Sequence, residues 1–148
     1  MKIPVTRQDP TYSIPARARS GDAGVDLAAS VAVEIAPGER ALVPTGIAVA
    51  IPDGFAGFVL PRSGLAVNHG VTVINAPGLI DSGYRGEVKV GIVNHGDTRF
   101  EISVGDRIAQ LVVMAVVSPE YVEVEELDTT SRGTGGFGST GVGFQQTT

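Results

Sequence analysis

Hydrophobic positions in this chain come in short runs, and the spacing that is typical of an amphipathic helix is hard to find. The runs are rich in β-branched residues and are separated by Gly, Pro, Asn and Asp, which predicts short strands joined by tight turns. The predicted strands span residues 31–35, 41–44, 47–51, 57–60, 71–75, 87–93, 107–113 and 121–124. Such a series predicts an all-β sandwich, jelly roll or barrel.

The pattern changes after Glu126, where the chain becomes rich in Gly, Ser and Thr and follows neither a strand nor a helix period. We therefore predict one β domain over residues 1–127 and a glycine-rich C-terminal arm over residues 128–148. A flexible polar tail is the simplest interpretation of the arm. Arg132 and Phe137 indicate that the arm also binds a ligand, because a guanidinium can contact phosphate and an aromatic ring can stack on a base.

Composition narrows the range of functions. The chain has 148 residues and no cysteine, which suits one domain and excludes disulfides, thiolate zinc sites and a cysteine nucleophile. Its net charge of −5 argues against a protein that coats a nucleic-acid polymer, although a few arginines suffice for a small anionic ligand. No apolar run approaches the roughly 18 residues of a membrane span. The first residues do not resemble a signal peptide, so we expect a cytoplasmic location and no membrane partner.

Two segments carry groups that suit a phosphate or a metal ion. In Ala-Gly-Val-Asp-Leu, strand alternation points Asp26 away from Val25 and Leu27, toward a polar cavity or simply toward solvent. In Pro-Arg-Ser-Gly-Leu-Ala, the guanidinium of Arg62, the hydroxyl of Ser63 and the exposed backbone N–H groups are what a phosphate needs. A short helix beginning near Ser63 would add its N-terminal partial charge. The alternative is a strand end with a surface arginine.

A third segment, residues 75–87, combines a Pro77-Gly78 turn with polar groups in an apolar neighbourhood. Backbone groups of such a hairpin can imitate the edge of a base, with the side-chain amide of Asn75 beside them. Asp81 is placed to act as a general base near a phosphate, and Tyr84 offers a flat ring to a sugar. A purely structural glycine-rich hairpin is the alternative, but the number of polar groups favours a functional site.

Gln110 interrupts an apolar strand in which Ile108 and Val112 share its face. A buried glutamine needs hydrogen-bond partners, and phosphate oxygens are one option among several. In the arm, successive glycines allow backbone N–H groups to converge on an anion, although the sequence is not a Walker A loop. His69 and His95 both lie in Asn-His-Gly sequences and are better explained as turn residues than as metal ligands or bases.

Together and in order, these segments resemble the five motifs of the homotrimeric dUTPase family. The five segments read Ala-Gly-Val-Asp-Leu, Pro-Arg-Ser-Gly-Leu-Ala, Gly-Leu-Ile-Asp-Ser-Gly-Tyr-Arg-Gly-Glu, Arg-Ile-Ala-Gln-Leu and Arg-Gly-Thr-Gly-Gly-Phe-Gly-Ser-Thr-Gly. They run from residue 23 to residue 141, so the resemblance covers most of the chain, and no motif position departs from the pattern.

The resemblance implies a jelly-roll-like subunit of a threefold trimer, with three active sites between subunits and a flexible arm that closes over a neighbour's site. It also implies hydrolysis of dUTP to dUMP and pyrophosphate, with Mg²⁺ as cofactor. Such an activity would limit uracil in DNA and supply dUMP for thymidylate synthesis.

The same likeness implies roles for individual residues. Asp81 would deprotonate the water that attacks the α-phosphorus, and Asp26 would hold Mg²⁺ through its water shell. Tyr84 would pack under deoxyribose and exclude a 2′-hydroxyl. The remaining positions would read uracil (Asn75, Gly78 and Ile80), contact phosphates (Arg62, Ser63, Gly64 and Gln110), clamp the outer phosphates from the arm (Arg132, Gly138, Ser139 and Thr140) and stack on the base (Phe137).

Two alternatives come from different functional classes. A dCTP deaminase shares the fold, but it needs a glutamate placed for deamination in the third segment, where this chain has Asp-Ser-Gly-Tyr. A non-catalytic nucleotide-binding or regulatory trimer is the other alternative, and the presence of both Asp81 and Arg132 argues against lost catalysis.

Overall fold

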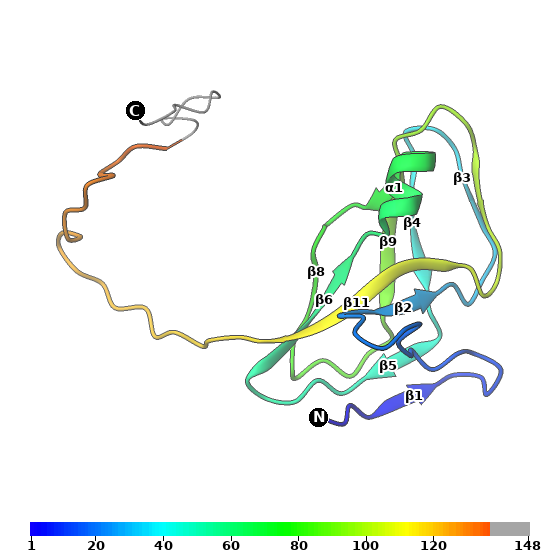
Figure 1. Ribbon diagram of the computed structural model, residues 1–148, viewed down its shortest axis with the longest axis horizontal. Helices are drawn as coiled ribbons and strands as arrows, with labels where there is room; N and C mark the ends of the chain where they lie inside the picture. The colour runs from blue at the N-terminus through cyan, green and yellow to red at the C-terminus, as the bar shows by residue number, and fades with distance from the viewer. Residues whose placement is uncertain (137–148) are drawn as a thin grey trace. The chain divides into compact units, whose positions relative to one another are not determined.

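The computed structural model of the protein describes residues 1–136, and all the strands and the helix in that part belong to a compact unit, Met1–Ser118 (Figure 1). A second unit begins at Pro119. The elements of the first unit are β1 (Val5–Arg7), β2 (Val25–Ala28), β3 (Val33–Ile35), β4 (Arg40–Pro44), β5 (Ile47–Val49), β6 (Phe55–Leu60), α1 (Ser63–His69), β7 (Val71–Val73), β8 (Gly78–Ile80), β9 (Lys89–Asn94), β10 (Phe100–Ile102) and β11 (Arg107–Ala115).

The strands form four sheets in which every pairing among the described residues is antiparallel. The largest sheet has the order β2-β11-β6-β8, and the second has the order β4-β9-β7. Two-stranded pairs, β1 with β5 and β10 with β3, complete the set. In Figure 1, α1 lies at the upper end of this unit and the β1–β5 pair at its lower end. The mostly β architecture confirms the predicted all-β, jelly-roll-like fold class.

Apolar residues from both larger sheets meet in one core. In the short strands β5 and β7 the first and third residues are buried, as strand alternation requires. Each fully buried Val, Leu or Ile side chain contributes about 1.5–3 kcal/mol through removal of apolar surface from water. The largest completely buried apolar side chains are Leu27, Ile35, Val43, Ile51, Val71, Val90 and Ile92.

The predicted strand over residues 121–124 is wrong. Tyr121 is 92% exposed and Val122 is 72% exposed, and no strand is present there. Alternation of apolar and polar residues indicates that one face of a segment could be buried. Burial also requires another part of the protein to pack against that face. The sequence did not predict β1 and β10, in which at most one of the three residues is buried.

The Pro77-Gly78 turn connects two sheets. The arms on either side of it, β7 and β8, are extended as predicted, but β7 pairs with β9 and β8 pairs with β6. The arms therefore do not form a two-stranded hairpin with each other, which corrects the simple hairpin interpretation. The turn, in which the Ala76–Pro77 peptide bond is cis, passes from the second sheet to the largest one.

The helix α1 begins at Ser63, as the sequence predicted, and none of its residues is buried. It ends at Gly70, whose left-handed conformation (φ 67°) suits glycine. His69 is thus the last helical residue rather than a turn residue, and its ring centroid lies 5.3 Å from that of Phe100. Within residues 1–136 this is the one helix, and it is too short to cross a membrane.

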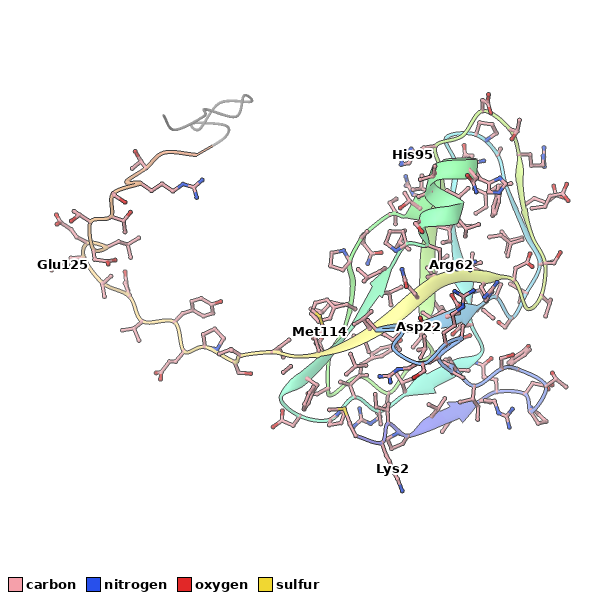
Figure 2. The ribbon with its side chains drawn as sticks, in the orientation of Figure 1. Lys2, Asp22, Arg62, His95, Met114 and Glu125 are labelled. Atoms are coloured by element: carbon pink, nitrogen blue, oxygen red, sulfur yellow. The ribbon has the colours of Figure 1, made fainter. Side chains whose placement is uncertain are left out.

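The turn that follows β9 holds the end of α1. The backbone N–H of His95 donates to the carbonyl of Gly70 at 2.9 Å, and Figure 2 shows His95 next to the helix. Asn94 is completely buried beneath this turn. Its Nδ2 donates to the carbonyls of Ile35 (2.9 Å) and Thr98 (2.8 Å), and its Oδ1 accepts from the N–H of Gly96 (2.9 Å).

We predict that Asn94→Ala lowers the free energy of unfolding by about 3 kcal/mol, because two carbonyls and one N–H lose their partners in a buried site. Urea denaturation at a fixed protein concentration measures this loss. The matched control is Asn68→Ala on the exposed surface of α1, which should change the free energy by less than about 0.5 kcal/mol. Equal urea midpoints for the two variants would contradict the prediction.

Candidate active site

A first pocket of about 290 Å³ lies beside β8 and β9 and collects the residues predicted to read base and sugar. A side chain at Gly78 would be crowded, because a Cβ there would lie 3.2 Å from the Cβ of Val59 and 3.3 Å from Nδ2 of Asn75. The backbone of the turn is therefore open to close approach by a flat ligand. The predicted residues that line this pocket are Asn75, Gly78, Ile80, Asp81 and Tyr84.

Asp81 and Tyr84 lie in one tight turn. The N–H of Tyr84 donates to the carbonyl of Asp81 at 3.1 Å, and Nη1 of Arg85 donates to the carbonyls of Ser82 and Tyr84. The Asp81 side chain is exposed, and its carboxylate has no hydrogen bond or ion pair within residues 1–136. Its oxygens are free to accept a proton from a water molecule.

A second pocket of about 470 Å³ collects the residues predicted to contact phosphate and metal: Asp26, Arg62, Ser63, Gly64 and Gln110. Three strands of the largest sheet bring them together. The Cα of Gln110 in β11 is opposite Asp26 in β2 on one side and Leu60 in β6 on the other. Arg62 follows β6 directly and, with Asp22, lies near β2 in Figure 2.

An ion-pair cluster lies at this second pocket. The Asp26 carboxylate lies 3.1 Å from Nε of Arg62 and 3.1 Å from Nη1 of Arg107, and Nη1 of Arg62 also donates to the carbonyl of Arg107 at 2.8 Å. The cluster itself has two guanidinium groups around one carboxylate; Arg62 and Asp26 line the second pocket, and Arg107 lies outside its lining. Such a cluster suits an anionic ligand that competes for the arginine donors.

Sequence reasoning missed Arg107. It lies in the fourth motif segment, but its position near Asp26 depends on the pairing of β11 with β2, which joins residues 81 positions apart. The same pairing contains a β-bulge between Arg107 and Ala109, and Ile108 and Ala109 are both buried. This bulge interrupts the alternation that the sequence analysis assumed for the start of the strand.

Gln110 is half-buried and already has a protein partner. Its Nε2 donates to the carbonyl of Pro61 at 2.9 Å. This hydrogen bond holds the residue that precedes Arg62, so Gln110 supports the segment that contains Arg62 from the neighbouring strand. The oxygen of the same amide lies close to Gly24, where an added Cβ would be 3.3 Å from it.

The two pockets have no lining residue in common. The base and sugar residues lie in one, together with Asp81, and the phosphate residues lie in the other, together with Asp26. The predicted site is therefore divided within a single copy of the chain.

Arg132 belongs to the second unit, where its Nε donates to the carbonyl of Gly135 at 3.0 Å. The other arm residues that the sequence predicted to contact substrate lie outside the described residues. They are Phe137, Gly138, Ser139 and Thr140.

The carboxylates of the second pocket are compatible with a hydrated magnesium ion. Residues 1–136 contain no group of three His, Cys, Asp or Glu side chains arranged to hold a metal. Two carboxylates line the pocket, Asp26 and Asp22, and one oxygen of Asp22 accepts the N–H of Arg19 at 2.8 Å. Mg²⁺ usually keeps several waters and takes one or two carboxylates plus substrate phosphates, so this donor set suits it.

Known proteins resemble this chain closely. The dUTPase family model matches residues 11–141. The deoxyuridine 5′-triphosphate nucleotidohydrolase of Nocardia farcinica is 56% identical over 140 residues, covering 94% of this chain and 85% of that protein. The protein of the same name from Thermobifida fusca is 54% identical over 142 residues, covering 95% of this chain and 79% of that protein.

A solved structure shares the fold as well. A mutant of the dUTPase of Staphylococcus bacteriophage 80alpha, determined with dUpNHpp, has a TM-score of 0.88 and 30% sequence identity to this chain. The match covers 95% of this chain and 99% of the phage protein. From the family model and from relatives at this level of identity and coverage, we conclude that the chain belongs to the dUTPase family.

Proposed function

We propose that this protein is a dUTP diphosphatase, which hydrolyses dUTP to dUMP and pyrophosphate. The observation that carries the proposal is the pair of pockets: one has a turn backbone, an aromatic ring and an exposed carboxylate, and the other has Arg62 in an ion pair with Asp26. Family membership and relatives named deoxyuridine 5′-triphosphate nucleotidohydrolase support it. In the cell this reaction would limit uracil in DNA and supply dUMP for thymidylate synthesis.

The first pocket would bind the nucleoside and hold the general base. The turn backbone around Gly78 and Ile80, with the amide of Asn75, would read the edge of uracil, and Tyr84 would pack under deoxyribose. Asp81 would accept a proton from the water that attacks the α-phosphorus. Its free, exposed carboxylate supports this role, because a base needs an open lone pair.

The second pocket would bind the triphosphate. Arg62 would contact its oxygens with Ser63, Gly64 and Gln110, and Asp26 would hold Mg²⁺ through the water shell of the ion. The bound ion would offset the negative charge of the triphosphate. Water cannot attack the α-phosphorus until that charge is offset. A related dUTPase from phage phi11, 26% identical to this chain, coordinates a structural Mg(II) ion.

We also propose that a complete active site forms between copies of the chain, in a homotrimer. The division of the base and phosphate residues between two pockets supports this arrangement, because one substrate must reach both sets. The glycine-rich arm over residues 128–148 would close the site, with Arg132 and the Gly138, Ser139 and Thr140 segment on the phosphates and Phe137 on the base. Glycines suit a segment that must change conformation when it closes.

The first test is pyrophosphate release from each deoxynucleoside triphosphate and from UTP, with Mg²⁺ and then with EDTA. We expect fast release from dUTP alone, and its loss in EDTA. Ammonia and dUMP from dCTP would indicate a bifunctional deaminase instead. No release of pyrophosphate from any substrate by a folded protein would favour the nucleotide-binding alternative.

Asp81→Asn should lower kcat for dUTP by about 10²- to 10⁴-fold, the range that a general base contributes. Binding of a non-hydrolysable dUTP analogue, measured by calorimetry, should stay within a few-fold of the wild-type value. The control is Asp53→Asn in the exposed Pro-Asp-Gly turn, which should keep the wild-type rate. A near-normal rate in Asp81→Asn would remove Asp81 as the base.

Arg132→Ala should slow hydrolysis by about 10³-fold or more, since an arginine that stabilises a phosphoryl-transfer transition state is worth that much. The control is Arg99→Ala, which removes an exposed ion pair with Glu34. That variant should keep the wild-type rate under single-turnover conditions. Equal rates for the two arginine variants would refute the proposed role of the arm.

A further inference from the structure

We propose that Gly86 is a specificity-determining residue. The absence of a side chain at this position lets the ring of Tyr84 lie against the backbone, and this fixes the surface that the sugar would meet. The inference rests on the proposed hydrolysis of dUTP and on the proposed contact of Tyr84 with deoxyribose.

The ring of Tyr84 occupies the space that a side chain at residue 86 would need. A Cβ built on Gly86 would lie 2.6 Å from Cζ and 3.0 Å from Cε2 of Tyr84, and closer still to the hydroxyl oxygen. Gly86 is not among the glycines with positive φ, so its backbone conformation is open to alanine. The need for glycine here comes from the ring alone.

A hydrogen bond holds the ring in this position. The hydroxyl of Tyr84 donates to the backbone carbonyl of Glu87 at 2.9 Å. The hydroxyl end of the ring is thus held by the carbonyl of Glu87 and lies against Gly86. A side chain that is 45% exposed would otherwise be free to move between rotamers.

The backbone that carries this carbonyl is anchored to the segment between β4 and β5. Oε1 of Glu87 accepts the N–H of Gly46 at 2.8 Å, and the N–H of Val88 donates to the carbonyl of Ile47 at 2.8 Å. Oγ1 of Thr45 donates to the carbonyl of Val88 at 2.5 Å. Because this backbone is held by three hydrogen bonds, an added methyl group at residue 86 would displace the ring.

A displaced ring would weaken selection against ribose. The ring of Tyr84 can exclude a 2′-hydroxyl by contact only if the ring does not move, since the extra oxygen atom is small. A shift of the ring by about 1 Å is enough to change a rate by up to about 10²-fold. Binding of uracil, which involves the turn around Gly78, should change much less.

The test compares kcat/KM for dUTP and for UTP in the wild-type protein, in Gly86→Ala and in Gly83→Ala. Gly83 is the matched control, because it lies in the same turn, lacks positive φ, and a Cβ there would meet nothing within 4 Å. We expect the dUTP/UTP ratio to fall about tenfold or more in Gly86→Ala. The ratio should stay at the wild-type value in Gly83→Ala.

Tyr84→Phe is the second variant, because it removes the hydrogen bond to Glu87 and adds no atom. It should lower the ratio in the same direction but by less, and it keeps the test decisive if Gly86→Ala is poorly folded. Wild-type ratios in both variants would overturn the inference, as would equal losses in Gly83→Ala and Gly86→Ala. A wild-type protein that cleaves UTP as readily as dUTP would refute the proposed function itself, and the inference with it.

Discussion

Backbone hydrogen bonds between β11 and its two neighbours, β2 and β6, determine where the groups that we propose bind phosphate lie. Gln110 is the residue of β11 whose Cα faces both Asp26 and Leu60. A slip of one residue in either pairing would turn the affected side chains to the opposite face of the sheet. The motifs around Asp26, Arg62 and Gln110 are therefore one structural unit, although about 80 residues separate the first from the last.

Charge and hydrogen bonding within that unit work together. Asp26 contacts two arginines, and Gln110 holds the carbonyl of Pro61, next to Arg62. These contacts position the guanidinium groups before any ligand arrives, which lowers the entropy cost of binding a phosphate. At partly exposed positions each ion pair contributes little to stability, about 1 kcal/mol or less. The main effect of these ion pairs is to orient the guanidinium groups.

The first pocket, which we propose binds the nucleoside, depends instead on the close approach of side chains to glycines. Asn75 packs against Gly78, and Tyr84 packs against Gly86, so polar and aromatic groups rest directly on backbone. This arrangement leaves peptide groups open to a ligand and holds the flanking side chains in place. The separation of this pocket from the arginine cluster means that assembly of copies is part of the proposed mechanism.

The sequence by itself determined the local features of this protein. Short runs rich in β-branched residues predicted the strands β4, β5 and β7, and the third segment predicted extended arms on both sides of Pro77-Gly78. The start of α1 near Ser63 and the membership of the family also followed from the sequence. Each predicted element depends on residues that are close together in the chain, because local periodicity indicates which face of a segment can be buried. Family membership depends on five short motifs in a fixed order.

Only the tertiary structure decided which segments meet. In the folded protein Arg107 contacts Asp26, and Gln110 donates to the carbonyl of Pro61. The strands β7 and β8 belong to different sheets. Residues 121–124 are exposed despite their alternating pattern. The physical reason is that strand pairing and side-chain contact join residues far apart in sequence. The free energy of such contacts depends on the whole packed arrangement, and no local pattern of residues contains it.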